Sequence, residues 1–331
     1  DVNRENTLRN CHIQHTGQLI LATPGVFVWQ SGHNRLVNNL IHDTPYCAVV
    51  ISGRITYNRL GKGECARTVR WPEIDAARGG QEPPGDWYAR EQFMHARHNL
   101  LERNEMHSVM QVLGDGNFVY VSGCGKGNTI RNNFMHDSGS YNINGNIRCD
   151  NDQHETVWEN NVILRSTGEG FINKGKNTFR NNVFAAIRSR TDSGIENAHS
   201  RGYIVMPSES PQGAVYERNV YLADEKDRAI IYHGTRRARN RMGKWGGWLW
   251  ECRSDWNVYW NTQDPGWADA FFAEVRPKGS DKNSIAADPG FIDWKNGDFR
   301  LKADAAAHRV GFREIDVNVC GLAEDSPAWL K

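Results

Sequence analysis

Short apolar segments separated by polar turns recur along the chain, and six of them share one pattern. Each copy places an apolar residue three positions before an asparagine and another apolar residue two positions after it. The clearest copies are LVNNLIHD (36–43), LERNEMHS (101–108), IRNNFMHD (130–137), WENNVILR (158–165), FRNNVFAA (179–186) and YERNVYLA (216–223). LRNCHIQH near the N-terminus and SDWNVYWN nearer the C-terminus are weaker copies.

The shared asparagines predict a solenoid. They are Asn39, Asn104, Asn133, Asn161, Asn182, Asn219 and Asn257. Intervals in the twenties with occasional insertions are typical of solenoids, and short alternating apolar runs favour strands over helices. Asparagine suits a turn because it tolerates left-handed backbone geometry and hydrogen-bonds to the backbone. We therefore expect an all-β right-handed parallel β-helix, with amides stacked on coils about 4.8 Å apart.

The same repeat defines the organisation of residues 1–331 as a single domain. The polar, Gly- and Pro-rich stretch 52–97 and the stretch 233–251 are predicted to be long loop insertions, and 278–331 a C-terminal cap. His42, His107 and His136 each follow a repeat asparagine by three positions, so they should form a structural column. The chain begins DVNRENTLRN, without features of a signal peptide, and we expect N-terminal material of the full protein to be missing.

Composition excludes several classes of function. The formal net charge of +1 gives no support for a nucleic-acid partner, and no stretch is apolar enough to cross a membrane. Seven cysteines without a CxxC pair argue against a zinc cluster and a complete disulfide framework. Some should be buried thiols, and one or two disulfides stay open. An extracytoplasmic location, secreted or periplasmic, fits the chain best. The oligomeric state is left open.

The stretch IRCDNDQHET (147–156) carries the candidate chemistry. If it begins as a strand, Ile147 and Cys149 face the core, while Arg148, Asp150 and Asp152 face outward. The Cβ atoms of the two aspartates would then lie about 6.6 Å apart. Paired carboxyl groups at such a separation are the machinery of glycoside hydrolysis, with retention or inversion left open.

Neighbouring coils add further acidic groups to this face. Counting back from the repeat asparagines places Glu169 beside Arg148, and Asp115 in LGDGN reaches the same face from a turn. Like charges this close should raise the pKa of one carboxyl group, as an acid/base pair requires. The candidate catalytic residues are therefore Asp150, Asp152, Asp115 and Glu169.

Other residues are candidates for binding substrate. Arg148 and Lys174 would stabilise a charged carboxylate, and His154 and Asn173 would border the site. Trp245 and Trp248 offer either a sugar-stacking surface or loop core. The Asp-x-Asp pattern also fits a solvated surface or a structural Ca²⁺ site, so no cofactor or catalytic metal is assigned.

LVNNLIHDTPYCAVVISG, LGDGNFVYVSGCGKGNTIRNNFMHD, IRCDNDQHETVWENNVI and KGKNTFRNNVFA resemble the parallel β-helix proteins of polysaccharide degradation. DPGFIDWKNGDFRL resembles their C-terminal segment. The nearest enzymes by resemblance are glycoside hydrolase families 141 and 120. The resemblance implies a poly- or oligosaccharide substrate, and it implies that Asp150, Asp152 and a carboxylate one coil away are acid, base or nucleophile.

Two rival functions share this fold. A polysaccharide lyase or epimerase would act on a uronate with a basic residue as the proton abstractor, and Arg148, Lys174 and His154 fit that role. A non-catalytic glycan-binding solenoid would bind through its outer face without a working pair of carboxyl groups. Because one fold serves all three functions, the fold does not decide between them.

Overall fold

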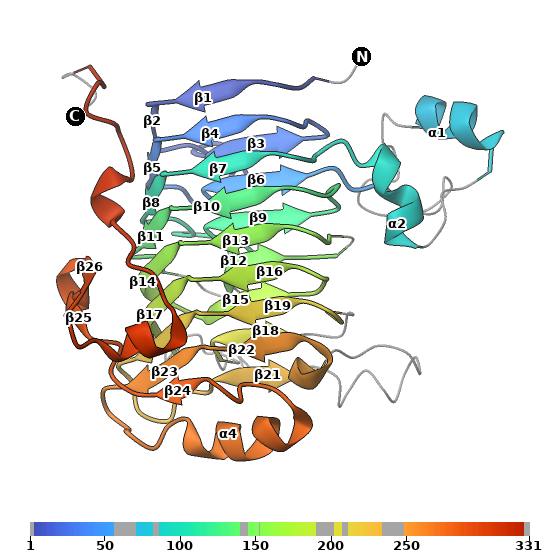
Figure 1. Ribbon diagram of the computed structural model, residues 1–331. Coiled ribbons are helices and arrows are strands. Elements are labelled where there is room, and N and C mark those ends of the chain that lie inside the picture. The colour runs from blue at the N-terminus through green and yellow to red at the C-terminus, as the bar shows by residue number, and fades with distance from the viewer. Residues whose placement is uncertain are drawn as a thin grey trace.

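Apart from one antiparallel pair of strands near the C-terminus, the strands of the protein stack into three sheets in which every pairing is parallel (Figure 1). This computed structural model describes residues 3–55, 71–81, 86–139, 145–151, 153–189, 202–206, 211–233 and 248–327. The chain adds one strand to each of the three sheets in turn and then begins the next coil. The predicted right-handed parallel β-helix is confirmed.

Each sheet takes one strand from each successive coil. Sheet 1 contains β1 (Thr7–Arg9), β4 (Arg35–Val37), β7 (Leu100–Glu102), β10 (Thr129–Arg131), β13 (Val157–Glu159), β16 (Thr178–Arg180), β19 (Val215–Glu217) and β22 (Arg253–Asp255). Sheet 2 contains β2 (His12–Gln14), β5 (Leu40–His42), β8 (Glu105–His107), β11 (Phe134–His136), β14 (Val162–Thr167), β17 (Val183–Arg188), β20 (Val220–Ala223), β23 (Val258–Asn261) and β24 (Ile285–Ala286). Sheet 3 contains β3 (Val26–Trp29), β6 (Val49–Ser52), β9 (Val119–Ser122), β12 (Gly145–Cys149), β15 (Glu169–Asn173), β18 (Ile204–Met206) and β21 (Ile231–His233).

The repeat asparagines form the predicted ladder between sheets 1 and 2. The side-chain Nδ2 of Asn133 donates to Oδ1 of Asn161 over 2.9 Å, and Asn161 donates to Asn182 over 3.0 Å. The same bond joins every consecutive pair of ladder residues from Asn39 to Asn257. Each buried amide thus has a partner on the next coil, which holds the coils in register.

The left-handed turn residue is the one before each ladder asparagine. Residues 38, 103, 132, 160, 181, 218 and 256 have φ between 53° and 61°. We expected the ladder asparagine itself to take this conformation, and that expectation is wrong. The ladder residue instead uses its side-chain amide for a hydrogen bond to the neighbouring coil.

Inward- and outward-facing residues alternate along the strands, and the inward-facing ones form the core. Ile130, Trp158 and Phe179 from sheet 1 are fully buried, as are Ile147 and Phe171 from sheet 3. The rings of Phe171 and Phe179 stack with centroids 4.4 Å apart. The predicted histidine column is also present, with the rings of His42, His107 and His136 stacked in series and His12 added above them.

The first predicted insertion leaves the stack between β6 and β7 (Figure 1). It contains α1 (Trp71–Arg78), α2 (Trp87–Arg90) and η1 (Glu91–Phe93), which share a small apolar cluster of their own. Of the second predicted insertion, residues 234–247 lie outside the described residues, and η2 (Leu249–Glu251) follows them.

The C-terminal part of the chain first closes the stack and then runs back along it. Helix α4 (Asp269–Val275) places Phe271 and Phe272 against the core, and η3 (Arg276–Lys278) follows it. Residues 287–327, here named the strap, then cover the outer face of sheet 2 (Figure 1). The strap contains β25 (Phe291–Asp293), η4 (Trp294–Asn296), β26 (Asp298–Leu301), η5 (Ala306–Val310) and η6 (Val317–Val319). Of the predicted cap at 278–331, the described part therefore lies mainly along the side of the stack, because the outer face of sheet 2 is apolar from β14 to β23.

The six described cysteines are free thiols. Cys47, Cys124 and Cys149 are fully buried, as predicted for some of the cysteines, and burial raises the pKa of the Cys47 and Cys124 thiols to about 12. Cys65 lies outside the described residues. Within the described part of the chain, no helix is long and apolar enough to cross a membrane.

Candidate functional site

The outer face of sheet 3 collects the predicted polar residues. Strand β12 pairs with β9 so that Arg148 lies beside Tyr120, and Ile147 and Cys149 point into the core as predicted. The pairing of Cys149 with Asn173 brings Lys174 next to Asp150 on the following coil. The strands β9, β12 and β15 therefore bring residues of three successive coils together around Asp150, and Arg54 joins them from the coil of β6.

Asp150 is the centre of this group, although its side chain is only 6% exposed. The hydroxyl of Tyr120 donates to Oδ2 of Asp150, and the Nζ of Lys174 pairs with Oδ1. Nη2 of Arg148 lies 3.2 Å from Oδ2, and Nη2 of Arg54 lies 3.8 Å from the same atom. One buried carboxylate is thus surrounded by three cations and a phenol. We name Arg54, Tyr120, Arg148, Asp150 and Lys174 the Asp150 cluster.

The electrostatics of the cluster keep Asp150 ionised. Burial by itself would raise the pKa of the Asp150 carboxyl group. The charges of Arg148 and Lys174, with hydrogen bonds from Lys174 and Tyr120, outweigh it and hold that pKa below its ordinary value. Burial and the Asp150 charge raise the pKa of the Tyr120 phenol. The expected raised carboxyl pKa is therefore not found at Asp150, whose environment favours the ionised carboxylate over a proton donor.

Asp115 reaches this face from the turn in which we predicted it. Its φ of 54° is left-handed, between Gly114 and Gly116. Oδ1 of Asp115 lies 2.5 Å from Nη1 of Arg148, and the Asp115 side chain is 71% exposed. The guanidinium of Arg148 therefore joins a solvent-facing carboxylate to the buried carboxylate of Asp150.

Glu169 does not lie beside Arg148, so its predicted position is wrong. The register pairs Glu169 with Gly145 and pairs Arg148 with Ile172. Only four positions separate Lys174 from Thr178, where the next sheet 1 strand begins, whereas seven separate Asp150 from Val157. Counting back from the ladder asparagine therefore misplaces this coil by three residues. The geometry gives no support for joint action by Glu169 and Asp150.

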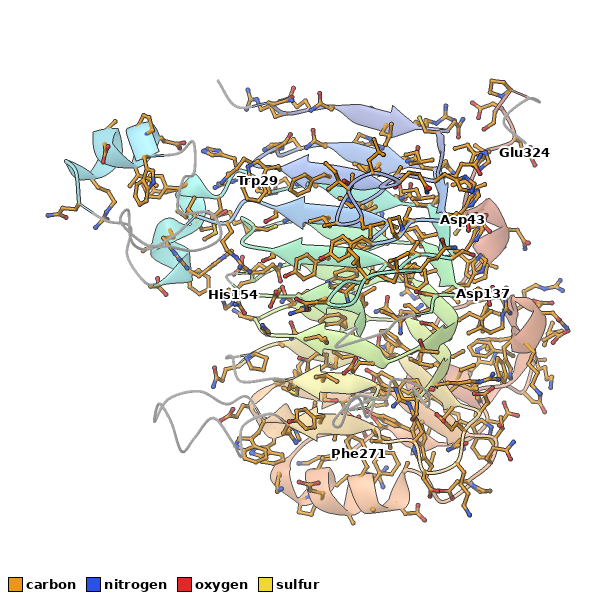
Figure 2. The ribbon with its side chains drawn as sticks, turned by 180° about the vertical axis from the view of Figure 1, so that it is seen from behind. Trp29, Asp43, Asp137, His154, Phe271 and Glu324 are labelled. Atoms are coloured by element: carbon orange, nitrogen blue, oxygen red, sulfur yellow. The ribbon has the colours of Figure 1, made fainter. Side chains whose placement is uncertain are left out.

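Two predicted binding residues, Asn173 and His154, make contacts away from the Asp150 cluster. Asn173 points into the coil, where its Nδ2 donates to the Tyr216 hydroxyl over 2.6 Å, so its placement does not support substrate contact. His154 packs against Trp87 and Tyr88 of the first insertion, with ring centroids 4.9 and 6.0 Å away (Figure 2). Its Nδ1 accepts from the Lys176 backbone.

The remaining predicted residues divide between described and undescribed parts of the chain. Asp152 and Trp245 lie outside the described residues. Trp248 stacks on Trp250 with centroids 4.6 Å apart, and Nζ of Lys278 lies 3.7 Å from the Trp250 centroid. Sugar stacking by Trp248 stays a prediction.

Sequence reasoning missed Tyr120 and Arg54 as members of the site. Tyr120 had a usable signal, because it takes the Arg148 position one coil earlier. Arg54 follows β6 at the start of the insertion and bonds Ser122 across the face, and no repeat position marks it. Among the described residues, no group of three or more His, Cys, Asp or Glu side chains could hold a metal ion.

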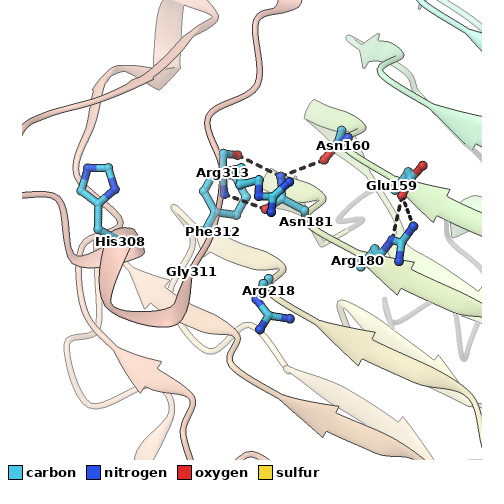
Figure 3. Close-up of a pocket in the computed structure, with 9 residues that line it drawn as sticks. All are labelled: Glu159, Asn160, Arg180, Asn181, Arg218, His308, Gly311, Phe312 and Arg313. Carbon is cyan, nitrogen blue, oxygen red and sulfur yellow. Dashed lines mark hydrogen bonds and ion pairs between the residues drawn. The ribbon is translucent and has the colours of Figure 1, made fainter.

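A separate groove of about 770 Å³ lies between sheet 1 and the strap (Figure 3). Its lining residues are Glu159, Asn160, Arg180, Asn181, Arg218, His308, Gly311, Phe312 and Arg313. Glu159 is the single acid among them, and it is paired with Arg180 at 2.6 Å. The groove therefore offers no pair of carboxyl groups for acid/base chemistry.

Comparisons with known proteins add little to this picture. No family model matches the sequence, and no curated protein matches it. Among solved structures, the complex of XylC with xylose is similar at 10% sequence identity and a TM-score of 0.29. The match covers 86% of this chain and 53% of that one, so this chain spans about half the length of the matched protein. A similarity this weak carries no argument about function.

Proposed function

We propose that the protein cleaves a poly- or oligosaccharide by hydrolysis on the outer face of sheet 3. The observation that supports this most is the bridge formed by Arg148 between Asp115 and Asp150. Two carboxylates, one exposed and one buried, lie on the same guanidinium and therefore close together. Different environments for two neighbouring carboxyl groups are what an acid/base division of labour requires. An extracytoplasmic location goes with this proposal.

The two carboxylates would take different roles. Asp150 keeps its negative charge and would stabilise the positive charge that develops on the sugar ring as the glycosidic C–O bond breaks. The proton for the departing oxygen would come from Asp115 on the solvent side, or from Asp152. Water would supply the hydroxyl group that the anomeric carbon receives, and its remaining proton would return to the carboxylate that gave up the first proton. Tyr120, Arg148 and Lys174 would hold Asp150 in place.

A specific observation also favours elimination from a uronate. Three cations, Arg54, Arg148 and Lys174, gather on one small part of the face, although the whole chain has a formal net charge of only +1. Cations at such a place would attract the substrate carboxylate and stabilise the anion formed when a base removes the neighbouring proton. Tyr120 and Lys174 would be the proton-transfer groups, and the products would carry a new C=C bond.

The experiment is an activity assay on neutral and acidic polysaccharides that reads reducing ends and unsaturated-product absorbance together. Reducing ends without absorbance would support hydrolysis, and absorbance would establish elimination instead. The Asp115→Asn/Asp150→Asn double variant should lose the activity, with a cooperative thermal transition as the control for folding. A wild type that binds glycans but cleaves none would overturn both reactions and leave a binding solenoid.

A further inference from the structure

Strand β3 carries two large aromatic side chains on its outer face. Phe27 and Trp29 alternate with the inward-facing Val26 and Val28. Phe27 is 56% exposed and Trp29 is 40% exposed. Their ring centroids lie 5.5 Å apart with planes tilted by 44°. We name this pair the aromatic platform; Figure 2 labels Trp29 on it.

The aromatic platform differs in exposure from the apolar residues on the rest of the outer face of sheet 3. The apolar residues at outward positions of later strands, such as Val50, Ile172 and Val205, are buried. Large aromatic side chains bury much apolar surface when they can, so two exposed together on one rigid strand mark a contact surface. Neither ring interrupts the core, because the core contacts of β3 come from Val26 and Val28.

The platform lies in line with the Asp150 cluster. Strand pairing places Phe27 next to Val50, Val50 next to Tyr120, and Tyr120 next to Arg148. Phe27 is therefore two coils from Tyr120 and three from Arg148. At the spacing of neighbouring strands, these separations are about 10 and 14 Å along the axis of the stack.

We propose that the aromatic platform is a remote sugar-binding subsite of the proposed active site. The C–H faces of sugar rings would stack on Phe27 and Trp29, while a unit further along the same chain lies over Arg148 and Asp150. A glycan chain fits because it is long, repeats at short intervals and presents apolar ring faces without needing a charged partner. This inference rests on the proposed function, since it takes the same substrate.

The subsite would make binding depend on chain length. A short oligosaccharide held at the Asp150 cluster does not span three coils, whereas a polymer does. Phe27→Ala and Trp29→Ala should therefore weaken binding to the polymer by about tenfold each. The loss should shrink as the substrate shortens, and it should appear in KM more than in kcat, because the platform is remote from the bond that breaks.

The test measures gel retention on soluble polysaccharides together with KM for a series of oligosaccharide lengths. Trp256→Ala is the matched control, because Trp256 is 37% exposed at a turn between sheets 1 and 2. Trp29→Phe should restore most of the retention, which a folding defect would not allow. Unchanged retention of both alanine variants, or equal losses at every length, would overturn the subsite.

Two further outcomes separate this inference from the proposed function. A wild type that is retained through Trp29 but cleaves nothing would support the platform and contradict the enzyme. If the wild type cleaves a glycan, and Phe27→Ala and Trp29→Ala bind it as well as Trp256→Ala does, the result would support the enzyme and contradict the platform. Sedimentation adds a last check: self-association abolished by Trp29→Ala would show that the platform binds a second copy, which overturns the subsite.

Discussion

The outer faces of sheets 1 and 3 use charge in opposite ways. Sheet 1 carries a stripe of acid–base pairs that each join neighbouring coils, with the three glutamates at one repeat position. The pairs are Glu102–Arg131 at 2.7 Å, Glu159–Arg180 at 2.6 Å and Glu217–Arg253 at 2.5 Å. The arginines of this stripe are solvent-exposed. Sheet 3 instead holds one buried carboxylate among three cations, on a few coils only.

This difference separates a structural pattern from a candidate site. A repeated pair whose arginine faces solvent neutralises itself and contributes little to stability, about 1 kcal/mol at most. Burying Asp150 with Arg148 and Lys174 carries a desolvation penalty that an apolar cluster of the same size would avoid. Such a cluster at one place on a solenoid is therefore a candidate for function.

The largest effect on folding should come from Asp150→Asn. The substitution leaves Lys174 without the charge of Asp150 and leaves Arg148 paired only with the exposed Asp115, so we expect the free energy of unfolding to fall by about 3 kcal/mol. Urea denaturation at pH 7 measures it. A loss no larger than that of Glu159→Gln would show that the two faces do not differ.

The same residue predicts a pH dependence. The pKa of Asp150 is lowered in the folded protein, so the native state favours the ionised carboxylate. Its stabilisation is complete above the unfolded pKa of about 3.9 and is lost as pH falls through the folded pKa. The stability difference between wild type and Asp150→Asn should therefore stay constant from pH 7 to about pH 5 and shrink below about pH 4. Shrinkage near neutral pH would contradict this assignment.

An intermediate effect is expected at the asparagine ladder between sheets 1 and 2. Asn161→Ala removes the amide that accepts from Asn133 and donates to Asn182. Because it leaves buried polar groups without partners, we expect a loss of about 2 kcal/mol in the free energy of unfolding. Thermal unfolding of Asn161→Ala beside the exposed variant Asn296→Ala measures this loss. Equal transition temperatures would show that the ladder does not stabilise the stack.

A smaller effect is expected in the sheet 1 stripe. Glu159→Gln breaks the pair with the exposed Arg180, so the free energy of unfolding should fall by less than about 1 kcal/mol. The difference from wild type should shrink further in high salt, because exposed pairs are screened. Urea denaturation at low and high salt checks this. A loss matching that of Asp150→Asn would remove the distinction between the faces.

The smallest effect on folding should come from Asp115→Asn. The Asp115 side chain is largely exposed, so the free energy of unfolding should stay within about 0.5 kcal/mol of wild type. Its loss should instead appear in activity. Denaturation and the assay on one preparation separate the two effects, and a stable variant with full activity would exclude Asp115 as the proton donor.

The sequence predicts the fold better than the site, for a physical reason. The ladder needs an asparagine at one place on each coil, so the repeat is visible directly. Asn34, Asn99 and Asn128 form a second ladder, which was missed although each precedes a first-ladder residue by five positions. The Asp150 cluster depends on turn lengths that vary between coils. Glu169 was therefore misplaced, and no repeat position marked Arg54.

The most direct test compares kcat/KM for Asp150→Asn, Asp115→Asn and Glu159→Gln on a polysaccharide that the wild type cleaves. We predict a fall of about 10²-fold or more for the two sheet 3 variants and a value near wild type for Glu159→Gln. A folded Asp150→Asn protein with full activity would show that the outer face of sheet 3 is not where the chemistry occurs.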